Sequence, residues 1–440
     1  MHLSILWHHH QPIYRHPKTG ESILPWVNYH ITKNYYQMAV LAKEQDYPCT
    51  FNLVPCLLEQ IELYSLGEAR DTLQQALEKD PEKLTPSQVA RLIKFLPPGS
   101  GKNSRSVIQI EALRSFFSPL LETGSDKESL LDTQKKIHQQ VIPLYRKLWK
   151  SGLAELTTSA YYHPLLPLVS DNRLGGEALM PSLPFSRPQD AEAQIENGRE
   201  YFHRLFGQYP RGFWPSEAAV SEEVTRAVAA KGFGYAVTDE NVLWKTLKTE
   251  PDPKLLYRPY ISQGLAIFFR DRELSDLISF EYHGWNELEA VSHFLTKLKD
   301  RRKVAPKSSI CVIALDGENP WAGYRENGVP FIRELYRRIK KTPELHPTSL
   351  GDYLRLNPPQ KEIRLVPGTW LGSFAKWIGS PAKNAAWDSL AKAREDCGPC
   401  EEIYIAEGSD WFWWFGEDNV TEFAALFESY IEKAYERQGK

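Results

Sequence analysis

Cysteine is scarce in this sequence, and long apolar runs are absent. Five cysteines in 440 residues make an odd and low number, so we expect no disulfide framework. No apolar stretch approaches the roughly 18 residues that a membrane-spanning helix needs. The segment Met1–His8 lacks the basic start and the apolar run of about 7–15 residues that mark a secretion signal. These features predict a cytoplasmic protein without a membrane span.

An excess of charge of one sign is also missing. Lys plus Arg number 53 and Asp plus Glu 56, which gives a net charge of −3. This balance provides no electrostatic footprint for nucleic acid or acidic membranes, so neither is an expected partner. Hydrophobic residues at 42% and charged residues at 25% are typical of globular domains. Aromatic residues are abundant, with 13 Trp, 21 Tyr and 19 Phe, and their rings can fill a core or hold the flat faces of sugars and bases.

Seven short runs with β character alternate with helical stretches. Several are continuous apolar runs, as in strands buried on both faces of a parallel sheet. The alternation predicts an α/β fold, either a barrel or an open sheet. The predicted strands are Leu3–His8, Thr50–Val54, Glu155–Ser159, Gly212–Trp214, Gly234–Thr238, Ala266–Phe269 and Ile310–Leu315.

Two regions fall outside this alternation. The first, at about residues 57–150, has helical character at Asp71–Lys79 and Lys127–Lys150 and a loop-like composition at Pro97–Ser104, so we expect a helical insertion. The second begins at residue 343, where strands mostly stop and Ala385–Glu395 and Val420–Arg437 have helical patterns. The predicted organisation is an α/β domain at 1–342, insertion included, and a C-terminal helical subdomain at 343–440.

Polar residues follow three of the predicted strands. His8 and His10 share one face of the first strand, because side chains alternate along a strand. Glu217 and Asp316 follow the fourth and seventh strands, and a buried carboxylate is costly unless it is used or paired. Two carboxylates in one pocket can divide acid and nucleophile roles, as in glycoside hydrolysis. Taken singly, each also suits a helix cap or an ion pair, and the imidazoles also suit half-buried positions bonded to the backbone.

Five separated segments together resemble glycoside hydrolase family 57, the retaining α-glucan enzymes, and in particular its α-amylase and amylopullulanase-like members. Their order along the chain matches the family, and they span nearly the whole sequence. The segments are His8–Pro12, Glu155–Leu168, Phe213–Glu217, Leu315–Glu318 and Ser409–Trp414 with Gly416. The stretches Arg270–Asp271, Ser275–Asp276 and Gly368–Trp370 are similar to the family as well.

The resemblance implies a (β/α)7 barrel followed by helices, which agrees with the count of seven strands. It also implies double displacement on α-1,4 glucans such as starch and glycogen, with α-1,6 linkages left open. Glu217 would be the nucleophile and Asp316 the general acid/base. The chain is shorter than typical branching members of the family, which favours hydrolysis over transfer.

Further residues would bind the substrate if the resemblance holds, and no metal or other cofactor is expected. Of the adjacent rings at 411–415, we expect one or two of the tryptophans to face the site and the others to lie in the core. The predicted substrate-binding residues are His8, His10, Gln11, His163, Trp214, Arg270, Asp271, Trp370, Asp410, Trp411, Trp413 and Trp414, with His283 as a further candidate.

Several alternatives stay open. An α-glucan transferase or a branching enzyme would share the catalytic pair. A metal-dependent barrel enzyme, such as a polysaccharide deacetylase or an α-mannosidase, could use His8, His10 and Asp316 as ligands. A glucan-binding protein without activity is the alternative outside enzymes. The Cys397–Cys400 segment has thioredoxin-like CxxC spacing, but it follows a predicted helix end instead of opening a helix after a strand, so redox catalysis is not expected.

Overall fold

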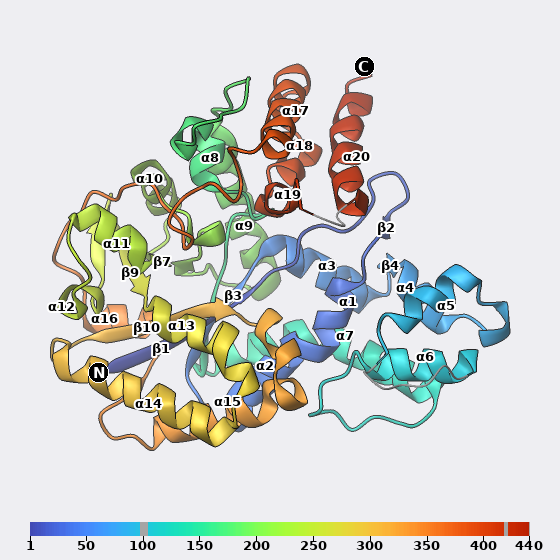
Figure 1. The fold of residues 1–440 in the computed structure, drawn as a ribbon, viewed down its shortest axis with the longest axis horizontal. Helices are drawn as coiled ribbons and strands as arrows, with labels where there is room; N and C mark the ends of the chain where they lie inside the picture. The colour runs from blue at the N-terminus through green and yellow to red at the C-terminus, as the bar shows by residue number, and fades with distance from the viewer. Residues whose placement is uncertain (97–103, 418–420, 440) are drawn as a thin grey trace.

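Parallel strands form a nearly closed barrel in the computed structural model, which describes residues 1–96, 104–417 and 421–439 (Figure 1). The strand order is β5-β3-β1-β10-β9-β7-β6, and an isolated bridge between Thr158 and Phe213 joins the two ends. All seven strands predicted from the sequence are confirmed. The strands are β1 (His2–His9), β3 (Cys49–Leu53), β5 (Ala154–Thr157), β6 (Gly212–Phe213), β7 (Tyr235–Asp239), β9 (Leu265–Arg270) and β10 (Ile310–Asp316).

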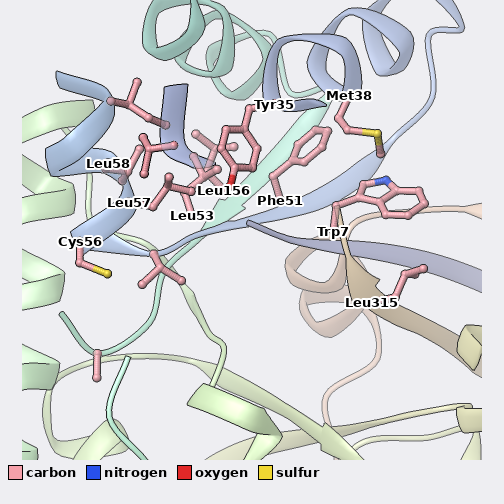
Figure 2. Packing of buried hydrophobic residues seen from close by; sticks show 14 of the residues in the cluster. Trp7, Tyr35, Met38, Phe51, Leu53, Cys56, Leu57, Leu58, Leu156 and Leu315 are labelled. Atoms are coloured by element: carbon pink, nitrogen blue, oxygen red, sulfur yellow. The ribbon is translucent and has the colours of Figure 1, made fainter. Parts of the chain in front are cut away.

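Alternation along the strands divides the core into two parts. In β1, Trp7 and the other odd-numbered apolar residues point outward and pack against the surrounding helices, whereas Leu6 points into the barrel. Figure 2 shows the outer part, where Trp7, Phe51 and Leu156 of neighbouring strands meet residues of the helices. Because His8, His10 and Asp316 continue the inward face, the same alternation aims them into the barrel mouth.

Helices cover the outside of the barrel, and a few short strands lie outside its seven-stranded order. The short strands that the sequence did not predict include β2 (Glu21–Ser22) and β4 (Arg70–Asp71), which pair in a separate sheet, and β8 (Tyr260–Ser262), which pairs with β9 of the barrel. The covering elements are α1 (Trp26–His30), the π-helical turn Ile31–Tyr35, α2 (Tyr36–Glu44), α8 (Leu166–Ser170), α9 (Pro188–Phe206), α10 (Glu222–Ala230), α11 (Glu240–Leu247), α12 (Pro253–Leu256), α13 (Arg272–Asp276), α14 (Glu287–Val304) and α15 (Val329–Lys340).

The predicted insertion is helical. It contains α3 (Pro55–Leu66), α4 (Thr72–Glu78), α5 (Pro86–Ile93), α6 (Arg105–Arg114) and α7 (Lys127–Lys150). In α7 the predicted bounds match the observed ones, and the side chain of Asp126 caps its first turn. Figure 1 shows α4, α5 and α6 to one side of the barrel. Most of the predicted loop Pro97–Ser104 lies outside the described residues.

The C-terminal helices are α17 (Pro381–Cys397), α18 (Glu401–Ala406), α19 (Ser409–Trp414) and α20 (Thr421–Arg437). They gather beside α8 and α9 (Figure 1), and the ring of Trp387 stacks on Phe412 at 4.2 Å between centroids. Before them, β11 (His346–Pro347) pairs with β1 and α16 (Leu350–Leu356) packs into the lower barrel, so these residues lie on the barrel side of the chain. The domain boundary at residue 342 stays a prediction. Among the described helices, none combines the length and apolar character required to cross a membrane.

Candidate active site

A cavity of about 1080 Å³ opens at the carboxyl ends of the barrel strands. Its wall includes side chains from β1, β9 and β10 and from the loops that follow β5 and β6. The structure brings together most of the residues that the sequence singled out. Those lining the cavity are His8, His10, Gln11, His163, Trp214, Glu217, Arg270, Asp316, Trp370, Asp410, Trp413 and Trp414.

Glu217 lies on a strained turn at Ser216–Ala218, shortly after the end of β6. Its backbone has φ of 58° and that of Ala218 has φ of 50°, a left-handed conformation that is costly for residues other than glycine. The turn buries the carboxylate, whose Oε1 accepts a hydrogen bond of 3.0 Å from the Ser409 hydroxyl. Burial raises the pKa of Glu217 to about 8, and the negative charges of Asp410 and Asp316 act in the same direction.

Asp316 is the last residue of β10, beside His8 in the parallel ladder. The side-chain amide of Asn319 donates to its Oδ2 at 2.8 Å. Burial raises the pKa of Asp316, while the Asn319 hydrogen bond and the charges of His10 and Arg270 oppose the rise. Glu217 and Asp316 thus face one cavity, each with a carboxyl that holds its proton more tightly than an exposed one.

Four rings of the cavity wall stack on one another. His10 and His163 lie 3.8 Å apart between ring centroids, and His8 lies 5.2 Å from His163 and 5.3 Å from Trp214. The Nδ1 atom of His8 hydrogen-bonds to Asn52 at 2.7 Å. Burial lowers the pKa of His163 well below its usual range, with the neighbouring His10 and His8 adding to the effect. The stack therefore forms a close-packed part of the cavity wall around His163.

The C-terminal helices supply part of the site. Oδ2 of Asp410 lies 2.8 Å from Nε2 of His10, which joins α19 to the residue following β1. Ser409 contacts Glu217 on one side and Nδ1 of His163 on the other, at 3.1 Å. The sequence motif pointed to Asp410, whereas a role for Ser409 was not predicted. Groups 400 positions apart in the chain thus meet in one cavity.

Arg270 is nearly fully buried and held by three partners. Its Nε donates to Asp239 at 2.7 Å, and its two terminal nitrogens donate to the carbonyl of Ala314 at 3.1 Å and to Asp276 at 3.2 Å. The guanidinium lies 5.5 Å from the ring centroid of Trp370. These bonds fix the cation in the cavity wall close enough to Asp316 to favour its ionised form.

The structure does not bring Asp271 and Trp411 to the cavity wall. Asp271 caps α13 by accepting from the backbone N–H of Leu274 at 3.0 Å, and it also accepts from the Tyr257 hydroxyl at 2.7 Å. The indole of Trp411 donates to the carbonyl of Ile405 at 2.7 Å, inside the core of the C-terminal helices. An Asp after a strand suits either a cap or a binding role, and here the cap is what forms.

Sequence reasoning missed several wall residues. Glu318 is buried, accepts from the backbone N–H of His10 at 3.1 Å, and has a pKa raised by burial and by Asp316. Its place two residues after Asp316, on the same inward face, was a usable signal. Other wall residues lie in α1 and the turn after it, or follow α13. They include Trp26, Tyr29, His30, Lys33, Asn34 and Phe280, and the wall also contains the lower-ranked candidate His283.

His10, His163 and Asp410 are the described residues that could hold a metal ion. One ligand atom from each lies within 4.8 Å of the others. However, the planes of the two imidazoles are inclined by 23° in a stack. Because nitrogen lone pairs lie in the ring planes, nearly parallel stacked rings do not direct them at one point. The arrangement fits hydrogen bonding better than coordination.

Several known proteins are similar to this chain. The family model for glycosyl hydrolase family 57 matches residues 4–366. The chain is 23% identical over 273 residues to alpha-amylase 1 of Dictyoglomus thermophilum, covering 59% of this chain and 34% of that protein. It is 24% identical over 280 residues to a 4-alpha-glucanotransferase of Thermococcus kodakarensis, covering 61% and 36%. It therefore spans about a third of the length of these two curated relatives.

The fold is similar to that of a solved structure over its full length. The alpha-amylase AmyC from Thermotoga maritima superimposes with a TM-score of 0.69 at 16% identity. The match covers 100% of this chain and 93% of that one. Thus the barrel and the helices that follow it both have counterparts in that structure.

Proposed function

The chain belongs to glycosyl hydrolase family 57, and from this membership we propose that it is a retaining α-glucan hydrolase of the α-amylase type. The observation that carries the proposal is the meeting of Glu217 and Asp316 in one cavity with tryptophans in its wall. Retaining glycosidases use two carboxyl groups, one as nucleophile and one as acid and then base. Indole rings provide flat apolar faces suited to packing against sugar rings.

The proposed reaction has two steps. In the first, a carboxylate oxygen of Glu217 bonds to the anomeric carbon while the bond to the leaving oxygen breaks, and Asp316 gives its proton to that oxygen. In the second, Asp316 takes a proton from water, whose oxygen bonds to the anomeric carbon as the ester to Glu217 breaks. Asp316 needs a proton at the start, and the rise in its pKa supports that role. Glu217 must be ionised to attack, which its rise in pKa opposes, so substrate binding or the surrounding donors have to favour the anion.

A glucan transferase is the second candidate, because one relative of this chain is named a 4-alpha-glucanotransferase. The two activities share the first step and differ in whether water or a sugar hydroxyl takes the glycosyl group. We place hydrolysis first and propose α-1,4 linkages as its target.

Residues 1–342 are the proposed catalytic barrel and 343–440 the proposed helical subdomain that contributes aromatic residues to the cleft. The proposed location is the cytoplasm, because five cysteines in 440 residues are too few, and odd in number, for a disulfide framework.

Product analysis on amylose, pullulan and maltooligosaccharides tests the proposal. New reducing ends from amylose support hydrolysis, whereas longer oligosaccharides made from maltotetraose without new reducing ends support transfer. Glu217→Gln and Asp316→Asn should each nearly abolish turnover while keeping the melting temperature, because each removes a group used in the transition state. Wild-type rates in either folded variant, or no action on any α-glucan, would refute the proposal.

A further inference from the structure

We propose that Ser409 is a positioning residue for the proposed nucleophile: its hydroxyl holds the Glu217 carboxylate and connects it to His163. This inference rests on the proposed function, because it assigns a task in the same reaction. It adds that a residue of the C-terminal helices sets the ionisation of a carboxylate on the barrel.

The hydroxyl of Ser409 bridges two groups of the barrel. Its Oγ lies 3.0 Å from Oε1 of Glu217 and 3.1 Å from Nδ1 of His163. A hydroxyl has one proton to donate, and an ionised carboxylate can accept but not donate. With Glu217 ionised, Ser409 therefore donates to Glu217 and accepts from His163, which places the imidazole proton on Nδ1.

The backbone around Ser409 fixes this bridge. The N–H of Ser409 donates to the carbonyl of His163 at 3.0 Å, and Pro164 forms an isolated β-bridge with Gly408. A Cβ atom at Gly408 would come within 3.0 Å of the Tyr162 carbonyl, so a residue with a side chain would press the two segments apart. Ser409 is fully buried. The main chain thus fixes the position of Ser409, and its buried hydroxyl contacts Glu217 and His163.

The charges around Glu217 explain why a donor is needed there. Asp410 on α19 and Asp316 on β10 both disfavour its anion, and burial disfavours it further. His163, whose Nδ1 lies 4.0 Å from Oε1 of Glu217, is held neutral by burial and so supplies no compensating positive charge. The hydrogen bond from Ser409 favours the anion against these effects. Without it, the carboxyl would keep its proton to a higher pH, and a protonated carboxyl is not a nucleophile.

The decisive variant is Ser409→Ala, with Ser409→Cys as the near-isosteric variant that keeps a weak donor. Ser429→Ala is the matched control, because that buried hydroxyl donates to the carbonyl of Leu426 inside α20. Circular dichroism checks that each variant folds. We expect the acidic limb of kcat/KM against pH to move to higher pH in Ser409→Ala, to a smaller extent in Ser409→Cys, and not at all in Ser429→Ala. At pH 7, Ser409→Ala should lose about tenfold to a hundredfold in kcat/KM, the usual effect of a charge-assisted hydrogen bond.

A second measurement keeps this inference separate from the proposed function. The infrared carboxyl band of Glu217, assigned by its loss in Glu217→Gln, should titrate at higher pH in Ser409→Ala than in the wild type. This readout requires no substrate. An unmoved infrared titration or an unmoved acidic limb in folded Ser409→Ala would overturn the positioning role. Inactivity of the wild type on α-glucans, with the infrared shift present, would instead refute the proposed function and leave the Ser409–Glu217 linkage standing.

Discussion

Trp411 and Trp414 lie on the same short helix, α19, yet their surroundings differ completely. Trp411 is 2% exposed and stacks on Phe423 at 4.3 Å between ring centroids. Trp414 is 45% exposed and lines the cavity. One helix therefore carries a ring that holds the C-terminal helices together and a ring that is available to a ligand.

Alanine substitution should separate these two tryptophans. Trp414→Ala should lower kcat/KM on long α-glucans about fivefold to tenfold, the loss of about 1 kcal/mol of stacking, with little change in melting temperature. Trp411→Ala should instead cost about 3–5 kcal/mol of unfolding free energy, as for other buried large aromatic residues. Kinetics and denaturant unfolding on both variants check this. If both variants lose stability and neither loses specific activity while folded, the assignment of Trp414 to the ligand is wrong.

Asp410→Asn should move the pH dependence in the direction opposite to Ser409→Ala. After burial, the charge of Asp410 is the strongest cause of the raised pKa of Glu217, which is about 8. A protonated Glu217 cannot act as the proposed nucleophile, so kcat/KM of the wild type should rise from pH 5 toward pH 8. Removing the Asp410 charge lowers the pKa of Glu217, and the acidic limb should shift to lower pH even if the plateau falls.

The control for this shift is Asp300→Asn, because Asp300 is exposed and pairs with Lys303. Its acidic limb should coincide with that of the wild type. If the acidic limb of Asp410→Asn coincides with that of the wild type, the charge of Asp410 does not govern the ionisation of Glu217.

Glu407 should make stability depend on pH. It is fully buried, and burial together with the nearby Asp190 raises its pKa well above the usual range. Its Oε2 accepts from Gln194 at 2.6 Å, whereas its Oε1 has no partner within the part of the chain that the structure describes. Because the folded pKa is the higher one, its contribution to stability is complete below about pH 4.3, the unfolded value, and is lost as pH rises toward the folded value.

The uncharged variant Glu407→Gln tests whether the protein loses stability in this direction as pH rises. Relative to the wild type, it should gain about 1–3 kcal/mol of unfolding free energy at pH 8 and less at pH 5. The exposed Glu395 on α17 offers the control Glu395→Gln, whose difference from the wild type should be the same at both pH values. A gain in Glu407→Gln that is larger at pH 5 than at pH 8 would contradict the protonated, buried state.

Dialysis against a chelator should leave activity on α-glucans unchanged. The covalent catalysis and proton transfer that we propose for Glu217 and Asp316 need no Lewis acid. Nε2 of His10 is already engaged with Asp410, so the three possible ligands have hydrogen-bonding tasks instead. Activity before and after dialysis, with zinc added back, is the measurement. A loss that zinc restores would favour the metal-dependent alternative over the carboxylate pair.

The alternation of short apolar runs with helical stretches explains why the barrel could be predicted from the sequence. Strands such as Ile310–Asp316 are continuous apolar runs, and each buries both faces, so the pattern is strong even for a short strand. The short strand β8 (Tyr260–Ser262) was missed because three residues are too few to show an alternation of buried and exposed side chains. The wall contributed by Trp26 and Tyr29 was missed for another reason: an aromatic residue has the same sequence signature in a core and at a cavity.

The candidate site was predictable where residue type and strand position coincide. His8 and Asp316 end buried strands on the inward face, and both line the cavity. Ser409 could not be singled out, because its position depends on how a helix far along the chain docks on the barrel. Asp271 shows the converse: its position after β9 suggested binding, but the following helix uses its carboxylate as a cap.

The central place of β1 in the barrel has a consequence for the timing of folding. His2 pairs with Ile310, a residue 308 positions later, and His8 pairs with Asp316. At about 5–20 residues per second, a ribosome would need roughly 15–60 s to make the intervening chain. During that interval one edge of β1 has no partner, which makes it a surface for chaperones or for unwanted strand pairing. Ser409 and Asp410 emerge later still, so a nascent chain carries Glu217 before it carries the serine and the aspartate that act on its ionisation.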